Sequence, residues 1–444
     1  MENFGRGPPQ LIPEVSYMKR TCINNMKQTK AIIIGGGPAG LATALRLQQK
    51  ANVICTIYEL RPAPSTLGSA IGILPNGLRL LDRLGVYSEL LHRGSSHSNM
   101  TIHSINGGVL GQKDMVAAGR EQTGYGYMRV KRTDLQDTLL KAVDKAGITL
   151  RYNKSLTSIT ESAHSVTVTF SDGTSDTADL LLGCDGIHSA VRRLHVDPDQ
   201  IPVYTGMSGL GAIVPASCVS DSAQKEMRGM NVTMTQEGMF GVMTCTASDD
   251  EILWFLSKEV HLPDSEDARS GWELHRQEEV DGFKTQLQET LKDAGGEWGD
   301  NLRQLVSNTT AVKFYPIYKL PTGGKWHKGR TLLLGDAAHA MPPHAGQGVS
   351  MAFEDAFLLA RLLEKDQSLK QTFKQFDDIR RPRVEDIANR ASGNAKVRRK
   401  TGSWGLWLKE MGLWMFMQGA WAFGMDRWGS EVQQMVYDVD AVNI

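Results

Sequence analysis

The order of apolar and polar positions divides most of the chain into four patterned segments. Residues 31–59 predict a buried strand, a glycine-rich turn, an amphipathic helix and a second strand, and residues 128–192 predict a helix followed by strands. Residues 200–320 mostly alternate between apolar and polar side chains, as strands with one buried face do, with a helical stretch near 270–295. Residues 331–400 predict a strand, a glycine-rich loop and a long helix. Strand–helix alternation around a β-rich middle indicates a mixed α/β fold.

The two ends of the chain depart from this pattern. Residues 1–29 are polar and contain proline, so we expect a flexible N-terminal arm without the apolar stretch of a signal peptide. Residues 401–430 predict a helix rich in Trp and Met. Tryptophan recurs there every seven residues, at Trp407, Trp414, Trp421 and Trp428. Three interpretations stay open for this stripe: packing against the body of the protein or a second subunit, weak contact with a membrane surface, or a lid over an apolar substrate.

Composition excludes several classes of protein. The 444 residues carry 49 basic and 49 acidic side chains, and this balance argues against nucleic acid as a partner. A hydrophobic share of 41% with 22% charged residues is typical of a globular chain. The five cysteines are widely spaced and form no CxxC pair, which predicts neither disulfides nor a metal site and favours the cytoplasm, with peripheral membrane association as an option.

The first glycine-rich turn carries a dinucleotide-binding fingerprint. The buried strand Ala31–Ile34 runs into GGGPAG, a GxGxxG pattern at the start of a helix. In this pattern Gly35 allows the tight turn, Gly37 lets a pyrophosphate approach the backbone, and Gly40 lets the helix pack on the strand. The second strand ends at Glu59, where a carboxylate binds ribose hydroxyls. This arrangement predicts dinucleotide binding but does not distinguish FAD from NAD.

Two later stretches each combine a strand with an acid and a turn. Asp179–Arg192 reads DLLLGCDGIHSAVR, and Thr331–Gly348 reads TLLLGDAAHAMPPHAGQG. Asp336 ends the second of these strands and can accept a hydrogen bond from a ribityl hydroxyl, although an acid there can also cap a helix. The loop 343–348 can offer backbone N–H groups to the polar edge of a ring system, with a helix N-terminus behind them.

Together these three motifs, GxGxxG, DG and GDAAHxxxP…GQG, resemble those of the class A flavoprotein aromatic hydroxylases, the salicylate hydroxylase-like FAD-dependent monooxygenases. The resemblance covers about residues 30–390. It implies a Rossmann-like FAD-binding domain interleaved with a β-sheet substrate domain and followed by a C-terminal helical region. It also implies FAD as cofactor, NAD(P)H as transient co-substrate, and hydroxylation of a small aromatic or phenolic metabolite by O2 through a flavin C4a-hydroperoxide.

The resemblance gives expected domain boundaries as well. We expect a flexible arm over 1–29, an FAD-binding domain over 30–103, 128–192 and 308–375, a substrate domain over 104–127 and 193–307, and C-terminal helices over 376–444.

Several cofactor contacts follow from matching positions in the family motifs. Glu59 is expected to hold the adenosine ribose, Gly72 to contact the flavin through its backbone, and Asp336 to bind the ribityl chain. Gly346 and Gly348 match the loop that lines the flavin ring.

Other positions carry family roles in binding both cofactors. Asp185 matches the acid of the DG motif, which serves both FAD and NAD(P)H in relatives, and Arg192 closes that motif. An arginine that begins an RxxL helix reaches the cofactor in relatives, and Arg132 fits this pattern better than Arg129, because Leu135 continues its helix at the right spacing.

The substrate side offers three candidate catalytic residues. Pro343 matches a proline whose carbonyl faces the isoalloxazine. His344 follows it and either reaches the substrate or serves only the loop. Tyr204 begins a strand that resembles the first strand of the substrate domain, and a place in the core is its alternative role.

Two other functions stay open on the same residues. One is epoxidation of an isoprenoid or indole-type secondary metabolite, because a methionine-rich middle segment allows a large, adaptable apolar pocket. The other is a non-catalytic protein that binds a prenyl group or similar ligand on the same fold. The presence of both the DG and the GDAAH stretches argues against this second alternative.

Overall fold

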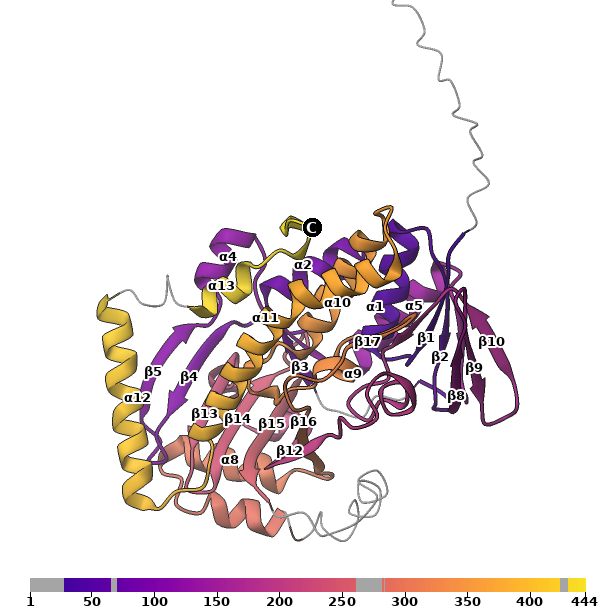
Figure 1. The fold of residues 1–444 in the computed structure, drawn as a ribbon. Helices are drawn as coiled ribbons and strands as arrows, with labels where there is room; N and C mark the ends of the chain where they lie inside the picture. Colours follow the sequence, from indigo (N-terminus) through magenta and orange to yellow (C-terminus); the bar gives the residue numbers. More distant parts are fainter. Residues whose placement is uncertain (1–27, 65–69, 261–281, 283, 424–429) are drawn as a thin grey trace, which may run out of the picture.

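The computed structural model describes residues 28–64, 70–260, 282, 284–423 and 430–444. Nearly all of the N-terminal arm expected over 1–29 and about half of the helical stretch expected near 270–295 lie outside these residues, and the described residues 284–290 are helical. Figure 1 shows two sheet-containing halves side by side, with the long helix α11 (Leu369–Val397) running across both. The mixed α/β expectation is confirmed.

One half is built on a six-stranded sheet in the order β17-β18-β11-β1-β2-β7. All neighbours are parallel except the β17–β18 pair. The strands are β1 (Lys30–Ile34), β2 (Ile54–Tyr58), β7 (Thr149–Arg151), β11 (Leu180–Gly183), β17 (His327–Lys328) and β18 (Thr331–Leu333). Every residue of β11 and β18 is buried, as expected for parallel strands whose two faces are both covered.

Helices on this half bury their apolar faces against the sheet and one another. Helix α1 (Pro38–Lys50) follows β1 and packs against α10 (Gly348–Leu363) and α5 (Arg132–Lys145). Leu41, Leu45 and Leu47 of α1 belong to the same core as the strands. Two small antiparallel sheets complete this half: β8 (Leu156–Glu161) with β9 (Val166–Phe170) and β10 (Ser175–Ala178), and the ribbon of β3 (Ala70–Ile73) and β6 (Met128–Lys131).

The other half is a seven-stranded sheet in the order β16-β12-β15-β14-β13-β4-β5. Its strands are β4 (Asn99–His103), β5 (Val109–Asp114), β12 (Val203–Pro215), β13 (Met230–Met234), β14 (Gly238–Thr244), β15 (Glu251–Glu259) and β16 (Lys313–Lys319). Helix α8 (Gly296–Ser307) contributes Trp298, Leu302 and Leu305 to the core of this half. The β pattern expected over 200–320 is confirmed.

Two strands of this sheet lie close to expected domain boundaries. Strand β4 ends at residue 103 and pairs with β13, and strand β16 lies after residue 308 and pairs with β12. Both strands are hydrogen-bonded into the large sheet, and the boundaries expected after residue 103 and before residue 308 stay predictions.

The C-terminal part is helical but more divided than its pattern suggested. The single long helix expected within 331–400 is two helices, α10 and α11, separated at residues 364–368. Helix α12 (Ser403–Phe423) follows along β5 at the edge of the large sheet, and α13 (Ser430–Val436) packs against α2 and α4 (Figure 1). Short helices fill the connections: α2 (Pro75–Arg83), α3 (Tyr87–Leu91), α4 (Ala117–Thr123), α6 (Asp221–Glu226) and α9 (Asp336–His339). Among the described helices, none is long and apolar enough to cross a membrane.

Candidate active site

The carboxyl ends of three neighbouring parallel strands bring the three sequence motifs together. Strand β1 lies between β2 and β11, and β11 also pairs with β18, so the glycine turn, the DG turn and the GD turn share one edge of the sheet. Ligands of open α/β sheets bind outside this edge. Segments separated by more than a hundred residues therefore meet at one site.

The glycine-rich turn leaves room for a ligand only where the motif requires it. Gly35 has φ +110°, and a Cβ there would lie 2.3 Å from the carbonyl oxygen of Cys184. A Cβ on Gly40 would lie 2.0 Å from the carbonyl oxygen of Gly35, so the helix can approach the turn only with glycine. Around Gly37, by contrast, no described atom lies within 4 Å of the Cβ position. Gly37 thus leaves the N-terminus of α1 open to a phosphate.

Glu59 is held beside this turn by two backbone N–H groups. Its Oε2 accepts a hydrogen bond from the N–H of Gly36 at 2.7 Å, and its Oε1 accepts one from Arg61 at 3.0 Å. These bonds orient the half-buried carboxylate at the end of β2 and leave further lone pairs for a ribose.

Asp336 and Arg132 lie near each other, on elements separated by about two hundred residues. Both side chains are exposed, although Gly335 and Ala337 on either side of Asp336 are buried. The surrounding protein desolvates Asp336 and raises the pKa of its carboxyl, while His339 and Arg132 oppose this shift. Arg132 is therefore near Asp336, whereas Arg129 lines a different pocket, between β6 and the large sheet.

The side chains of the DG motif hold their own turn in place, in addition to the cofactor role expected from the family. Asp185 accepts hydrogen bonds from the hydroxyl of Ser189 at 2.5 Å and from the N–H groups of Ala190 and Val191 at 2.6 and 3.1 Å. Arg192 is buried and donates to the carbonyl of Ala337 at 2.8 Å. Asp185 thus shapes its own turn, and Arg192 ties that turn to the GD motif.

The loop from Pro343 to Gly348 presents alternate residues to the site. Pro343, Gly346 and Gly348 are exposed, and His344 and Gln347 are buried. Gly346 has φ +64°, and the space where a Cβ of Gly346 or Gly348 would lie holds no described atom within 4 Å. The loop therefore shows its backbone to the open side, as the cradle of a planar ring would.

His344 is the least satisfied polar side chain of the loop. It is 8% exposed, and neither ring nitrogen has a hydrogen-bond partner in the described part of the chain. Burial, with a smaller effect of Arg398, lowers the pKa of His344 to about 3, so the imidazole is neutral. The amide of Asn394 holds the carbonyl oxygen of His344 at 3.2 Å.

Behind the loop lies a buried ionic network that sequence reasoning missed. Asp355 accepts hydrogen bonds from the N–H of Gly335 at 2.8 Å and from Arg380 at 2.7 Å, and it lies 2.7 Å from His339. Burial alone would raise the pKa of Asp355, but His339 and Arg380 outweigh it and the pKa is lowered. The network connects the turn after β18 to α10 and α11.

Glu354 extends this network, through Asn76, to Gln347 in the 343–348 loop. It pairs with Arg380 at 2.7 Å and with Arg383 at 2.6 Å, and it accepts a bond from Asn76 at 2.9 Å. Asn76 also donates to Gln347 at 3.0 Å. Two adjacent acids within the apolar helix 348–363 were the available signal, since buried acids need cationic partners.

Gly72 lies on β3, opposite Arg129 of β6. A Cβ on Gly72 would lie 2.5 Å from the hydroxyl of Tyr127, so a larger residue there would require the Tyr127 ring to shift. Residues 65–69, which precede this strand, lie outside the described residues.

Tyr204 is placed in an irregular part of β12, where the register with β16 shifts. Its hydroxyl lies 2.8 Å from the hydroxyl of Ser208 and donates to the carbonyl of Val260 at 2.8 Å. The geometry gives Tyr204 a structural task, and its catalytic role stays a prediction without support from these contacts.

The donor set fits FAD. The open backbone at Gly37, the oriented carboxylate of Glu59, the exposed pair of Asp336 and Arg132, and the bare loop around Gly346 offer a phosphate site, ribose and ribityl acceptors and a ring cradle along one edge. No group of three or more His, Cys, Asp or Glu side chains able to hold a metal occurs among the described residues.

Comparison with known proteins agrees with this geometry. The model of the FAD binding domain family matches residues 28–294 and 319–391. The chain is 28% identical over 373 residues to 3-amino-4-hydroxybenzoate 2-monooxygenase of Streptomyces platensis, covering 81% of this chain and 86% of that protein. It is 28% identical to 6-hydroxynicotinate 3-monooxygenase of Bordetella bronchiseptica, covering 82% and 91%. The solved structure of Klebsiella pneumoniae HpxO with FAD and uric acid shares the fold, with TM-score 0.76, 23% identity and coverage of 92% and 97%.

Proposed function

Because the chain belongs to the FAD binding domain family, we propose that it is an FAD-dependent monooxygenase that uses NAD(P)H and O2 to hydroxylate a small aromatic or phenolic compound. The observation that carries this proposal is the meeting of the glycine turn, the GD turn and the 343–348 loop at one sheet edge. Relatives of similar length act on hydroxylated aromatic acids, as their names state, and this supports a phenolic substrate.

Each cofactor contact in the proposal has a physical basis. Gly35, Gly37 and Gly40 shape the phosphate site, and Glu59 holds a ribose. Asp336 and Arg132 bind the ribityl and phosphate groups, and Asp185 shapes the turn beside them. Gly72, Gly346 and Gly348 let backbone approach the ring. When bound, FAD supplies the redox chemistry that activates O2 with electrons from NAD(P)H.

His344 is the proposed substrate contact. A neutral imidazole whose two nitrogens have no partner among the described residues can accept a hydrogen bond from a phenolic hydroxyl and donate another. This contact would raise the electron density of the ring to be hydroxylated. Pro343, which is exposed beside His344, would cover the reacting face of the flavin and exclude water from it.

The test is to purify the chain, measure its bound FAD, and follow NADH and NADPH oxidation with a panel of phenols, prenylated aromatics and indoles. We expect a yellow protein whose NAD(P)H oxidation rises with a phenolic compound and yields a hydroxylated product. A colourless protein after incubation with FAD would contradict the proposal. Epoxide or diol products from prenylated compounds would favour the epoxidase alternative, and ligand binding without any oxidation would favour a non-catalytic binding protein.

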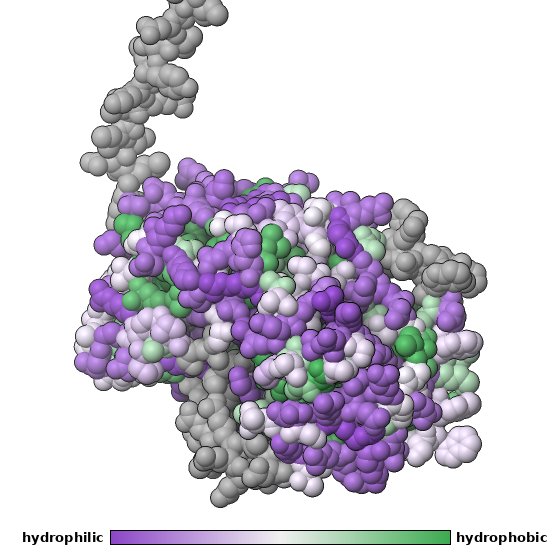
Figure 2. Space-filling view, turned by 180° about the vertical axis from the view of Figure 1, so that it is seen from behind, coloured by the Kyte–Doolittle hydropathy of each residue, from purple (hydrophilic) through white to green (hydrophobic). Residues whose placement is uncertain are grey.

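We further propose that the open face of α12 makes a weak contact outside this chain, with a second copy or a membrane surface. Leu406 and Met417 on one side of α12 are buried, whereas Trp404, Trp407 and Trp414 on the other are 81%, 53% and 48% exposed. Figure 2 shows a mostly hydrophilic surface with pale and green side chains gathered at the edge where α12 lies. Trp428 lies outside the described residues. The free state of the four described cysteines supports a cytoplasmic location.

A further inference from the structure

The buried side chain of Gln136 ties helix α5 to the glycine-rich turn. Gln136 is 6% exposed, and its Nε2 donates a hydrogen bond of 2.6 Å to the carbonyl oxygen of Gly36. The two residues are 100 positions apart in sequence, and Gln136 belongs to none of the three cofactor motifs. Burying an amide costs free energy unless it is hydrogen-bonded, so this bond fixes the side chain in one place.

The peptide groups of the turn are held from several sides. The N–H of Gly35 donates a hydrogen bond to the carbonyl of Tyr58 at 2.8 Å, and the N–H of Gly36 donates one to Glu59 at 2.7 Å. Within the described chain, no residue accepts a hydrogen bond from the N–H of Gly37. That N–H is therefore available to a ligand at the start of helix α1.

The bond from Gln136 sets the direction of this available N–H. The carbonyl of Gly36 and the N–H of Gly37 belong to one planar trans peptide, in which the two groups point in opposite directions. Because the carbonyl oxygen is held toward α5, the N–H of Gly37 points away from α5. The space beside Gly37 holds no described atom within 4 Å of the Cβ position, so a ligand can reach the turn there.

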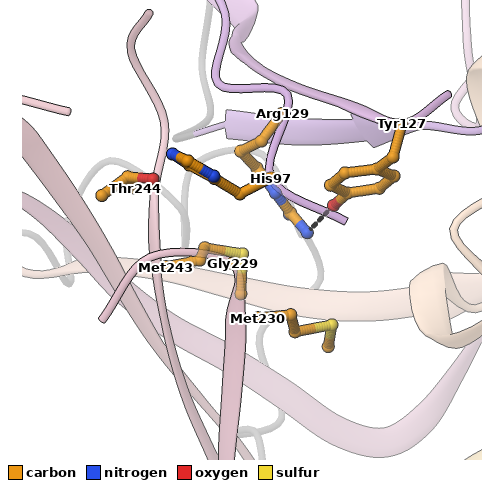
Figure 3. Close-up of a pocket in the computed structure, with 7 residues that line it drawn as sticks. All are labelled: His97, Tyr127, Arg129, Gly229, Met230, Met243 and Thr244. Atoms are coloured by element: carbon orange, nitrogen blue, oxygen red, sulfur yellow. Dashed lines mark hydrogen bonds between the residues drawn. The ribbon is translucent and has the colours of Figure 1, made fainter. Parts of the chain in front are cut away.

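Helix α5 also carries the arginine that we expect to contact the cofactor. Arg132 lies one turn before Gln136, and residues four apart are neighbours on the surface of a helix. Arg129, on the strand that precedes α5, points instead toward the hydroxyl of Tyr127 and a pocket beside the large sheet (Figure 3). The part of this segment that reaches the glycine turn is thus α5, and not the end of β6.

We propose that Gln136 is a positioning residue for FAD, which holds the Gly36–Gly37 peptide so that the N–H of Gly37 is available to the pyrophosphate. This inference rests on the proposed function only in taking FAD as the cofactor, and it adds a residue outside the three motifs. Gln136 acts through the peptide that it orients. A donor that is already oriented loses little freedom when the phosphate binds, so removing the bond should lower the affinity for FAD.

The test measures FAD binding by the full-length wild type, Gln136→Met and Gln136→Glu. Each holoenzyme is diluted, and the fluorescence of released flavin gives the dissociation constant of FAD at about pH 5.5 and about pH 8. Methionine has nearly the length of glutamine but donates no hydrogen bond. We expect Gln136→Met to raise the dissociation constant about 10-fold at both pH values, the effect of losing about one hydrogen bond.

Gln136→Glu supplies a donor only when the introduced carboxyl is protonated. At about pH 8 its carboxylate faces the carbonyl of Gly36 without a proton to donate, and FAD should bind about 30-fold or more weakly than to wild type. Burial and the nearby Glu59 raise the pKa of a carboxyl at this place, and Arg132 lowers it. At about pH 5.5 the protonated carboxyl should restore the affinity to within about 3-fold of wild type, which methionine cannot do at any pH.

Gln48→Met is the matched control, because it removes the same kind of hydrogen bond between α1 and the end of α5. The exposed amide of Gln48 donates to the carbonyl of Ala146 at 2.8 Å. This bond lies at the end of α1 that is opposite to the glycine turn, so Gln48→Met should change the dissociation constant of FAD less than about twofold. The melting temperature reports whether each variant is folded. If Gln136→Met does not fold, the two pH values within Gln136→Glu still decide.

Three results would overturn the inference. These are unchanged FAD binding in Gln136→Met, equal weakness of Gln136→Glu at both pH values, or a loss in Gln48→Met as large as in Gln136→Met. A wild type that holds no FAD would contradict both the inference and the proposed function. If FAD affinity follows the donor as expected but no compound of the panel stimulates NAD(P)H oxidation, the proposed function is contradicted and the role of Gln136 is supported.

Discussion

The polar side chains around the candidate site fall into two groups, one fully paired and one with unpaired nitrogens. Behind the 343–348 loop, Asp355, Glu354, Arg380 and Arg383 are paired with one another at 2.6–2.7 Å. By contrast, Arg129 and His344 keep buried nitrogens without hydrogen-bond partners among the described residues. A paired network holds one geometry, which suits a cofactor that stays in place, whereas unpaired groups retain hydrogen-bonding capacity for a ligand that comes and goes.

The paired side should be the more sensitive to substitution. Asp355→Ala leaves Arg380 and His339 without their shared carboxylate, and breaking a buried pair costs about 3–5 kcal/mol. We expect that loss in the free energy of unfolding, measured by denaturant titration, together with reduced FAD content.

The matched control for this prediction is Asp377→Ala. Asp377 pairs with Arg381 at 2.8 Å, but both side chains are about a quarter exposed. We expect a loss of about 0–1 kcal/mol there, since partly exposed pairs contribute little. Equal losses in the two variants would mean that the network does not set the stability of this side.

Cofactor affinity is the next largest expected effect. Asp336→Ala removes the proposed ribityl acceptor, and hydrogen bonds to a charged group are worth about 1.5–3 kcal/mol, so the dissociation constant of FAD should rise about 10–100-fold. The fold should persist, because the exposed side chain of Asp336 fills no part of the core. Asp172→Ala, in an exposed turn of the same half, should leave FAD affinity within about twofold. Unchanged FAD binding in Asp336→Ala would remove this residue from the cofactor site.

The paired side was also the harder to predict from sequence. The turns at Gly35 and Asp336 were predictable because their chemistry is local: a strand, a tight turn and a helix start occupy consecutive residues. Their meeting at one edge follows from the strand order that the structure shows. The Asp355–Arg380 pair joins two helices, and nothing in the local pattern of either names its partner.

Long-range pairing also decides which sheet takes up strands β4 and β16. Strands β4 and β16 are local neighbours of the first half in sequence but are hydrogen-bonded into the large sheet. Arg129 and Arg132 lie three residues apart, and the sequence motif favoured Arg132 as the cofactor contact. In the structure, Arg129 lies on strand β6 and Arg132 begins helix α5, so their side chains reach different parts of the molecule.

A pH titration tests the unpaired side directly. A histidine with a pKa near 6.5 unfolded and about 3 folded is protonated only in the unfolded chain between these values. Protonation of His344 in the unfolded chain therefore does not reduce the free energy of unfolding above about pH 7. As the pH drops, it reduces that free energy, by about 1–2 kcal/mol at pH 5. His344→Gln should show a shallower loss of unfolding free energy between pH 7 and 5 than wild type, whereas His164→Gln, in an exposed turn, should keep the wild-type slope. Parallel slopes in all three proteins would show that His344 is solvated or paired.

Helix α12 shows a similar difference between its two faces. One face is hydrogen-bonded to the rest of the chain, and the other is exposed. Glu410 accepts hydrogen bonds from the hydroxyl of Ser104 and the N–H of Ile105, both at 2.8 Å, so Glu410→Ala should cost about 1–3 kcal/mol. Trp404 is 81% exposed, and Trp404→Ser should change the unfolding free energy by no more than about 0.5 kcal/mol.

The effect of Trp404→Ser should appear instead in association, measured by light scattering over a concentration series and by co-sedimentation with anionic vesicles. Loss of self-association would identify a second copy as the partner of the open face, and loss of vesicle binding would identify a lipid surface. Trp404→Ser could instead lower the unfolding free energy by more than about 1 kcal/mol and change neither association. That result would show that Trp404 packs within its own chain and that this face of α12 has no partner outside it.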